Sequence, residues 1–414
     1  MQAALSLGSN LGDRLSHLNQ AAALIHKLPD TNIVKASSAY ENPPLLPKDA
    51  PADWYQLFLN CAVLIQTRLP AQTLLQATQQ IEKQLQRHRQ ARWSPRTIDI
   101  DLITYADDSI NTDTLTLPHP GACSRNFVLA PLMEIAPQLL INRQSVLHHY
   151  RALSEKLPAW MQIVNVTPDS FSGDGLLDQA ANDLPDNPNY IDLGAESTRP
   201  NAHPVSAEEE WSRLEPQLQK HVSGQWIRPK ISIDTRHAAT AAKAVAYGVD
   251  MINDVSGLAD PQMLEVIAQA DCDIAVMHNL GIPADPAVTL AHNVDPIAEV
   301  LAFLELRLQQ LAQVGISNDR IWIDPGIGFG KQAEQSWHLL QNIAQLHQLG
   351  ARVFVGHSRK SFLKTVTAAD AAERDIHTVA LSQILAQSAE LIRVHNLSLH
   401  QQYSQTRWRM QAQF

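Results

Sequence analysis

The stretch RIWIDPG, residues 320–326, contains the repeating unit of the second half of the chain: a short apolar run that ends in a polar or glycine-containing turn. Further runs of this kind lie between residues 161 and 395. They are MQIVNV (161–166), NYIDLGAE (189–196), KISIDT (230–235), MINDVSG (251–257), DIAVMH (273–278), RVFVGHS (352–358) and LIRVH (391–395). Helix-like stretches separate most of the runs. Eight buried strands that alternate with helices predict a (β/α)8 TIM barrel.

In a barrel of this kind, the active site lies at the carboxyl ends of the strands. Polar residues stand at or just after these ends: Asn165, Glu196, Asp234, Asn253, His278, Asp324, His357 and His395. A barrel would bring them to one mouth, whereas an open sheet would leave them along an edge. We therefore predict one site there, built from acids, amides and cations. The first barrel helix, at about 176–184, is expected to be truncated because prolines follow it at 185 and 188.

The first half of the chain alternates strand and helix patterns in the order βαββαβ, which predicts a ferredoxin-like α+β domain. Strands are expected at 2–7, 33–39, 57–67 and 98–105, with helices at 13–28 and 70–86. The pattern is weak between the prolines at 137 and 158. We therefore expect the α+β domain at 1–140, a linker at 141–158 and the barrel at 159–414.

Two acidic residues, Asp99 and Asp101, alternate with apolar residues in the last of these strands. Alternate residues of a strand share a face, so the two carboxylates are expected to lie close together. They repel each other unless a cation lies between them, and oxygen ligands suit Mg²⁺ that carries phosphates. Arg92 and Arg96 precede them and could neutralise a polyphosphate. The alternative is an exposed acidic strand with solvated arginines, and spacing alone does not separate the two.

Composition and charge narrow the classes of function. The net charge of -10 argues against a general nucleic-acid-binding protein. The apolar runs are shorter than the roughly 18 residues of a membrane span, and the N-terminus lacks the basic region of a signal peptide. The three cysteines lie far apart and form no CxxC pair. We therefore predict a cytoplasmic protein that has no disulfide framework and contacts neither nucleic acid nor membrane.

Motifs of the first half, in a fixed order, carry a resemblance to a known family. They are GSNLGDR (8–14), SSAYENPPL (37–45), LN (59–60), RWSPRTIDIDL (92–102), PHP (118–120) and RNFVLAPLMEIAP (125–137). Together they resemble hydroxymethyl-dihydropterin pyrophosphokinase. The resemblance implies that the domain transfers a pyrophosphoryl group from ATP to hydroxymethyl-dihydropterin and releases AMP.

The same resemblance implies roles for individual residues. Asp99 and Asp101 would hold two Mg²⁺ ions. The catalytic set would be these aspartates with Arg87, Arg89, Arg92 and Arg96. ATP would bind to Gln79, Glu82, Arg92, Arg96, His119 and Arg125. The pterin would bind to Asn42, Pro43, Leu45, Phe58, Asn60 and Phe127, with the aromatic rings stacked on it.

Motifs of the second half resemble a different family. They are NVTPDSFSGDG (165–175), IDLGAESTRP (191–200), SIDT (232–235), INDVSG (252–257), MH (277–278), DPGIGFGK (324–331), VGHSRKS (355–361) and RVH (393–395). Together they resemble dihydropteroate synthase. The resemblance implies condensation of the pterin pyrophosphate with p-aminobenzoate, which yields dihydropteroate and pyrophosphate. It also implies a homodimer through the barrel.

Residue roles again follow from the resemblance alone. The pterin would bind to Asp234, Asn253, Met277, Asp324, Gly356 and Lys360. Asn165 with one Mg²⁺, Arg393 and His395 would bind the pyrophosphate. The p-aminobenzoate side would comprise Thr198, Arg199, Pro200, Phe329 and Ser361.

Three alternatives to a bifunctional enzyme stay open at this point. The barrel could be a non-catalytic docking module attached to an active kinase. The ferredoxin-like sheet could bind RNA, although the aromatic pattern of such sheets is missing. The barrel could be a methyltransferase that acts on a reduced folate, and an assay with p-aminobenzoate would separate that activity from the synthase.

Overall fold

The computed structural model describes residues 1–87, 91, 93–166, 187–197, 203–222 and 224–412. The chain divides into two compact units. Unit 1 comprises Met1–Leu157, Gly224–Pro229 and Ser404–Phe414, and unit 2 comprises Pro158–Ser223 and Lys230–Tyr403. Among the described residues, no helix combines the length and the apolar character that a membrane span needs.

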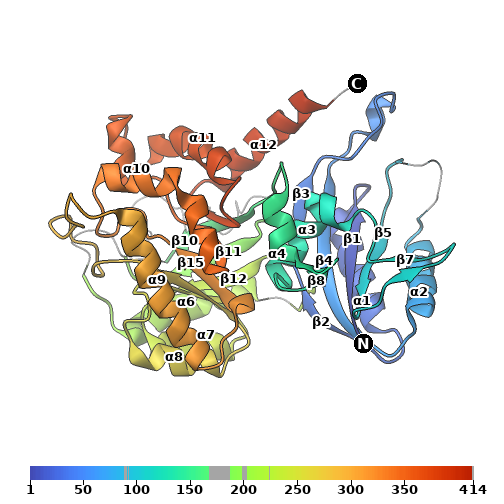
Figure 1. Cartoon of the computed structure of the whole chain (residues 1–414), viewed down its shortest axis with the longest axis horizontal. Coiled ribbons are helices and arrows are strands. Elements are labelled where there is room, and N and C mark those ends of the chain that lie inside the picture. Colours follow the sequence, from blue (N-terminus) through green and yellow to red (C-terminus); the bar gives the residue numbers. More distant parts are fainter. Residues whose placement is uncertain (88–90, 92, 167–186, 198–202, 223, 413–414) are drawn as a thin grey trace. The chain divides into compact units, whose positions relative to one another are not determined.

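Unit 1 is built on an antiparallel sheet whose strands follow the order β2-β4-β1-β5, with the short β3 paired to β4 (Figure 1). The strands are β1 (Gln2–Ser9), β2 (Thr31–Ala36), β3 (Tyr40–Asn42), β4 (Phe58–Thr67) and β5 (Asp99–Tyr105). The first strand thus lies between the third and the fourth long strand, as a split βαβ arrangement requires. The predicted ferredoxin-like α+β fold is confirmed.

Two helices cover this sheet, α1 (Arg14–His26) and α2 (Ala71–Gln84). Asp13 caps the start of helix α1, and its carboxylate accepts a hydrogen bond of 3.0 Å from the amide of Ser16. Its apolar side, which includes Leu18 and Ile25, is fully buried against the strands. Shorter elements follow: β6 (Ile110–Asn111), β7 (Thr116–Leu117) and α3 (Asn126–Ile135).

The segment predicted as a linker, 141–158, is folded over most of its length. It contributes to the hairpin of β8 (Leu140–Ile141) and β9 (Gln144–Ser145) and contains the helix α4 (Val146–Ala152). The side chains of Val146, Leu147 and Tyr150 are buried, and α4 packs against α3. The sequence pattern was weak because a seven-residue helix offers only two turns of periodicity.

Unit 2 is a closed barrel of eight parallel strands in chain order (Figure 1). The strands are β10 (Ala159–Asn165), β11 (Tyr190–Gly194), β12 (Lys230–Asp234), β13 (Met251–Asp254), β14 (Asp273–Met277), β15 (Ile321–Asp324), β16 (Arg352–Val355) and β17 (Leu391–Val394). The outer helices are α6 (Ala207–His221), α7 (Ala238–Ala246), α8 (Pro261–Ala268), α9 (Pro296–Gln313), α10 (Ala333–Gln341) and α11 (Asp375–Leu385). The last helix, α12 (Leu397–Gln411), begins in unit 2, and its residues from Ser404 onward belong to unit 1. The predicted TIM barrel is confirmed, and the truncated first helix predicted at 176–184 lies outside the described residues.

The amino-terminal ends of the barrel strands are closed by a buried charged cluster. Arg352 has no exposed surface and lies 2.8 Å from a carboxylate oxygen of Asp273. Its guanidinium also lies 4.0 Å from the ring centroid of Trp322, whose indole nitrogen donates to the same aspartate. The opposite, carboxyl-terminal ends are therefore the side left for a ligand.

Candidate active sites

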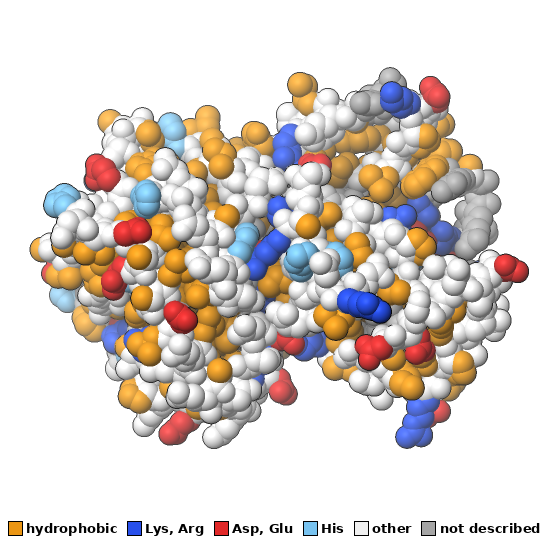
Figure 2. Space-filling view, in the orientation of Figure 1, with side chains coloured by type: hydrophobic (Ala, Val, Ile, Leu, Met, Phe, Trp, Pro, Cys, Tyr) orange, Lys and Arg blue, Asp and Glu red, His pale blue; other side chains and the backbone are white. Residues whose placement is uncertain are grey.

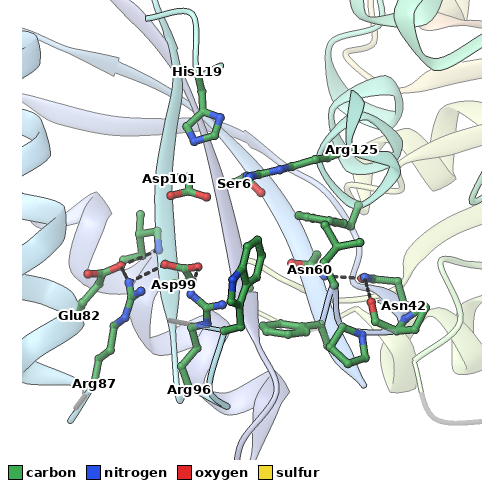
Figure 3. Close-up of a pocket in the computed structure, with 18 of the residues that line it drawn as sticks. Ser6, Asn42, Asn60, Glu82, Arg87, Arg96, Asp99, Asp101, His119 and Arg125 are labelled. Atoms are coloured by element: carbon green, nitrogen blue, oxygen red, sulfur yellow. Dashed lines mark hydrogen bonds and ion pairs between the residues drawn. The ribbon is translucent and has the colours of Figure 1, made fainter. Parts of the chain in front are cut away.

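Unit 1 contains a cavity of about 610 Å³ above the carboxylates of β5 (Figure 3). Every described residue that the sequence analysis assigned to this site lines the cavity. These residues are Asn42, Pro43, Leu45, Phe58, Asn60, Gln79, Glu82, Arg87, Arg96, Asp99, Asp101, His119, Arg125 and Phe127. Arg89 and Arg92 lie outside the described residues. Segments far apart in the sequence therefore meet around one space.

Asp99 and Asp101 project from the same face of β5 into this cavity (Figure 3). Asp99 lies 2.5 Å from Arg87 and 2.8 Å from Arg96, so two guanidinium groups share one carboxylate. Burial raises the pKa of Asp101, and the charge of Asp99 raises it further. A cation bound at both carboxylates would relieve this repulsion.

Glu82 of α2 faces the cavity but is largely engaged by protein groups. One of its oxygens accepts a hydrogen bond of 2.9 Å from the amide of Ile100, and it forms an ion pair with Arg87. Burial raises the pKa of Glu82, although Arg87 opposes this shift. The side chain thus ties α2 to β5 and holds the arginine over Asp99.

The opposite wall of the cavity is aromatic and amide-bearing. Phe58 and Phe127 line it, and each has an arginine over its ring: Arg96 lies 5.7 Å from the centroid of Phe58, and Arg125 lies 5.9 Å from that of Phe127. Asn60 is buried between these groups. Flat aromatic faces beside a buried amide suit a planar heterocycle that carries polar edges.

The mouth of the barrel in unit 2 brings together acids and cations from four strands. Arg393 of β17 donates to Asp192 of β11 at 2.6 Å and to Asp234 of β12 at 2.7 Å. Asn253 of β13 donates to the same Asp192 at 3.2 Å. Burial raises the pKa of Asp234 to about 7, although Arg393 acts in the opposite direction. Asp234 and Asn253 lie at or near the carboxyl ends of their strands, where the barrel was predicted to gather polar groups, whereas Asp192 lies in the middle of β11.

Lys360 occupies the same mouth. Its Nζ donates to the carbonyl oxygen of Ile327 at 2.5 Å and lies 4.6 Å from the ring centroid of Phe329. A side chain at Gly356 would lie 3.7 Å from an oxygen of Asp324 and 3.9 Å from this nitrogen, so the glycine keeps the space between them open. Burial lowers the pKa of Lys360 to about 8, although Asp324 raises it.

For the remaining residues predicted for the barrel site, the structure shows no hydrogen bond or ion pair, among the described residues, with Arg393, Asp234 or Lys360. Met277 is buried and pairs with Asp324 in the parallel sheet, and His395 contacts the hydroxyl of Ser358 at 3.0 Å. Asn165, at the end of β10, and Ser361 are exposed. Thr198, Arg199 and Pro200 lie outside the described residues.

The comparisons with known proteins agree for both units. Residues 4–137 match the sequence family 7,8-dihydro-6-hydroxymethylpterin-pyrophosphokinase, and residues 161–395 match the family pterin binding enzyme. The chain is 32% identical to the folate synthesis bifunctional protein of Chlamydia caviae, and the match covers 96% of this chain and 95% of that protein. The chain belongs to the bifunctional folate synthesis proteins. It is a transferase with a pyrophosphokinase and a dihydropteroate synthase domain.

Further relatives match along most of the chain, and a solved dihydropteroate synthase matches part of it. The folate synthesis bifunctional protein, mitochondrial, of Pisum sativum is 33% identical over 95% of this chain and 86% of its own length. The folic acid synthesis protein fol1 of Schizosaccharomyces pombe is 32% identical, and the chain spans 57% of its length. The dihydropteroate synthase of Anaplasma phagocytophilum, solved with bound 6-hydroxymethylpterin-monophosphate, is 35% identical with a TM-score of 0.54. That match covers 62% of this chain and 99% of the solved one.

The donor set of the pyrophosphokinase cavity fits magnesium that carries phosphates. Among the described residues, no three His, Cys, Asp or Glu side chains form a metal-binding cluster. Mg²⁺ usually keeps several waters and binds one or two carboxylates together with substrate phosphates, so Asp99 and Asp101 suffice. ATP and magnesium are typical of this family. In the synthase barrel the resemblance assigns Mg²⁺ to Asn165 alone, and one amide oxygen does not by itself make a magnesium site.

Several polar residues at the ends of the synthase strands serve the surrounding structure instead of the mouth. Glu196 forms two hydrogen bonds with Arg236, at 2.7 Å and 2.9 Å. His357 has no exposed surface and contacts the hydroxyl of Ser382 on α11, so its side chain is turned away from the barrel axis. A strand-end position alone does not distinguish these from ligand-facing groups, because neighbouring residues of a strand point to opposite faces.

Sequence reasoning missed three residues of these sites. Asp192 is buried within an apolar run and accepts hydrogen bonds from both Arg393 and Asn253. An acidic residue inside a predicted buried strand is rare, and this could have marked Asp192 as a site residue. Ser6 of β1 faces the pyrophosphokinase cavity and pairs with Asp101 in the sheet. Lys331, also buried, donates to the carbonyl oxygens of Gly326 and Phe329 and fixes the loop after β15.

Proposed function

We propose that the two sites act in succession on one pterin. The pyrophosphokinase cavity would bind hydroxymethyl-dihydropterin between Phe58 and Phe127, with ATP on the side of Asp99 and Asp101. The cavity volume of about 610 Å³ and the division into an aromatic wall and a charged wall support this assignment. We keep the domain limits 1–140 and 159–414 as part of the proposal.

In the first step, the hydroxymethyl oxygen of the pterin attacks the β-phosphorus of ATP and loses its proton to solvent, and the bond between the α-phosphate and the β-phosphorus breaks with release of AMP. Two Mg²⁺ ions held by Asp99 and Asp101 would supply positive charge at the phosphates. Arg87 and Arg96, which share Asp99 in this structure, are placed to exchange that carboxylate for phosphate oxygens as charge moves. Gln79, His119 and Arg125 would complete the ATP side, together with Arg89 and Arg92.

In the second step, the synthase mouth would bind the amino-pyrimidinone ring of the pterin pyrophosphate through Asp234, Asn253, Asp324 and Lys360. The carbon–oxygen bond of the methylene group breaks, and pyrophosphate leaves with the electron pair. The amine of p-aminobenzoate attacks the resulting cation and then loses one proton to solvent. Arg393 and His395 would hold the leaving pyrophosphate, with Asn165 beside them. Phe329 and Ser361 would line the p-aminobenzoate side together with Thr198, Arg199 and Pro200. The enzyme would act by positioning and charge stabilisation, without a covalent intermediate.

The clustering of Asp192, Asp234, Arg393 and Lys360 at one barrel mouth carries this proposal against a non-catalytic barrel. A docking module has no need for such a cluster, because a buried ion pair is often no more stable than apolar side chains packed in its place. On the face seen in Figure 2, acidic and basic side chains are interspersed, which does not provide the continuous positive field of a nucleic-acid-binding surface.

We also propose that two copies associate through the barrel and that the enzyme acts in the cytoplasm. Ile376 and Ile384 of α11 lie two helical turns apart and are 68% and 71% exposed. These two side chains offer apolar surface that a second copy would cover.

The test of the whole proposal is turnover in one reaction that contains hydroxymethyl-dihydropterin, ATP and p-aminobenzoate. AMP, pyrophosphate and dihydropteroate are expected in equal amounts, and each is quantified separately. AMP without dihydropteroate would indicate an inactive barrel. Transfer of a methyl group from a reduced folate, with no product from p-aminobenzoate, would identify the barrel as a methyltransferase.

A further inference from the structure

Two loops of the synthase mouth are linked by one buried carboxylate. Asp375, the first residue of α11, is 9% exposed. Its Oδ1 accepts a hydrogen bond of 2.6 Å from Nε of Arg359. Its Oδ2 accepts one of 2.7 Å from the same guanidinium and one of 3.0 Å from the side-chain nitrogen of Asn396. Arg359 follows β16 and Asn396 follows β17, so a group on α11 bridges the ends of two neighbouring strands.

The loop after β16 needs support from outside because its backbone is strained at Arg359. The φ angle of this arginine is 60°, in the left-handed region that residues with a side chain rarely adopt. Its amide donates to the hydroxyl of Thr378 on α11 at 3.3 Å, and its carbonyl oxygen accepts from the guanidinium of Arg374 at 3.1 Å. Together with the ion pair to Asp375, these contacts fix the backbone that carries the next residue, Lys360.

On the side of β17, Asn396 presents its side-chain nitrogen to Asp375. The side-chain oxygen of Asn396 accepts the amide of Leu399, in the first turn of α12, at 3.1 Å, so the nitrogen is the group that faces the carboxylate. An aspartate at residue 396 would have no donor, and the two carboxylates would repel each other. Burial alone would raise the pKa of Asp375, but the hydrogen bonds from Arg359 and Asn396 lower it below its usual value, so this carboxylate is ionised at neutral pH.

We propose that Asp375 is a positioning residue of the synthase step: it sets the distance between Lys360, assigned to the pterin, and His395, assigned to the pyrophosphate. The inference rests on the proposed function, in which these two groups hold opposite sides of the carbon–oxygen bond that breaks. A second link joins the same loops, because the hydroxyl of Ser358 contacts the ring of His395 at 3.0 Å and accepts the amide of His395 at 3.2 Å.

A link of this kind affects the whole substrate more than its separate halves. Each half contacts the groups of one loop, so its affinity does not depend on the distance between the loops. The joined substrate binds to both loops at once, and a misplacement of about 1 Å can lower the rate about 10²-fold. The substrate and its fragments therefore distinguish a positioning role from general support of the site.

The experiment compares Asp375→Asn, Asn396→Asp and the double variant that exchanges the two residues. Asp375→Asn removes the charge that pairs with Arg359, and Asn396→Asp places a second carboxylate beside the first. In each single variant, kcat/KM for pterin pyrophosphate should fall about tenfold or more, the effect of losing a hydrogen bond to a charged group. The double variant keeps one carboxylate and one amide between the loops, so its kcat/KM should be about threefold or more above that of Asn396→Asp.

Inorganic pyrophosphate and 6-hydroxymethylpterin serve as the two halves of the substrate, and each is measured as an inhibitor of the synthase step of the full chain. Their inhibition constants should stay within about twofold of those of the unmodified chain in all three variants. The matched controls are Asp370→Asn, exposed in the segment before α11, and Asn318→Asp, exposed just before β15. Both controls should leave kcat/KM unchanged.

Three results would overturn the inference. One is full kcat/KM in both single variants. Another is a loss of kcat/KM that is matched by an equal loss of affinity for either fragment, since the two residues would then support the site as a whole. The third is a double variant that is no better than Asn396→Asp. If Asp375→Asn does not fold, Asn396→Asp and the double variant decide. An unmodified chain that forms no dihydropteroate would instead refute the proposed function, on which the inference depends.

Discussion

Arg393 and Asp192 form a hydrogen-bonded ion pair across the synthase mouth, with Nε of the arginine 2.6 Å from Oδ2 of the aspartate. Asp192 has no exposed surface, and the same oxygen accepts the amide of Asn253 at 3.2 Å. One carboxylate thus fixes a cation that we assign to the pyrophosphate and an amide that we assign to the pterin. Without it, Arg393 would be left to Asp234 alone.

The variant Asp192→Asn keeps the size of the side chain and removes its charge. We expect kcat/KM of the synthase step for pterin pyrophosphate to fall about 30-fold, which corresponds to roughly 2 kcal/mol for a buried hydrogen bond to a charged group. The release of AMP from ATP should be unchanged, because it belongs to the other site. Steady-state assays of the two half-reactions measure both effects.

The control for this variant is Asp271→Asn, which makes the same exchange at an exposed residue of the barrel unit. A variant at 192 with full synthase activity would mean that Asn253 and Arg393 hold their places without it. An equal loss in both half-reactions would point to general misfolding.

Asp99→Ala, in the pyrophosphokinase site, tests whether the two sites carry out separate reactions. The variant removes the carboxylate shared by Arg87 and Arg96 and half of the proposed magnesium-binding pair. AMP release should fall about 10²–10³-fold, the range for loss of a group that stabilises charge in a transition state. Synthase activity on preformed pterin pyrophosphate should stay the same, as should both activities of Asp113→Ala, an exposed residue in unit 1. Loss of synthase activity in Asp99→Ala would contradict the assignment of the two reactions to separate sites.

The strands and the faces of their side chains could be predicted because the patterns that mark them are local. These patterns are the alternation of polar and apolar residues and the short continuous apolar runs. Asp99 and Asp101 were placed on one face by their spacing alone, and the structure points both into the cavity. Elements shorter than two or three turns lack such a signal, and this is why no helix was predicted at α4.

Long-range pairings could not be read from the sequence. Asp192 meets Arg393 across a separation of 201 residues, and only the closed barrel brings them together. The side-chain nitrogen of Asn396 reaches Asp375 only because the barrel places the end of β17 beside the start of α11. Likewise, His357 was expected at the mouth, but its side chain contacts Ser382 behind the strand.

Arg352→Met tests the closed end of the barrel. The substitution leaves the carboxylate of Asp273 without its guanidinium partner and removes the stack on Trp322. Breaking a buried pair costs about 3 kcal/mol or more, which for a unit of this size lowers its melting temperature by roughly 6–12 °C. Calorimetry of the full chain should show the barrel transition shifted and the pyrophosphokinase transition unmoved. A double variant that also carries Asp273→Asn should recover part of the loss, because the unpaired charge is then absent.

The pH dependence of the synthase step follows from the two perturbed groups of its mouth. Asp234, with a pKa of about 7, accepts hydrogen bonds from the pterin only when it is ionised, so kcat/KM for pterin pyrophosphate should fall below that pH. Lys360, with a pKa of about 8, donates its charge-assisted hydrogen bond only when it is protonated, so kcat/KM should fall again above that pH. Because the two losses lie on opposite sides, the pH profile of kcat/KM should be a narrow bell with its maximum between the two pKa values. These pKa values apply because kcat/KM reports the ionisation of groups in the free enzyme.

Two variants assign the limbs of this bell. Asp234→Asn should remove the acidic limb, and Lys360→Arg should remove the alkaline limb because a guanidinium stays charged over the whole range. Both should also lower the maximum. The substrate ionises identically in all three assays, so a limb that persists in its matching variant would belong to the pyrophosphate and not to the protein. If both limbs persist, neither Asp234 nor Lys360 touches the pterin, and the assignment of the mouth as its binding site is wrong.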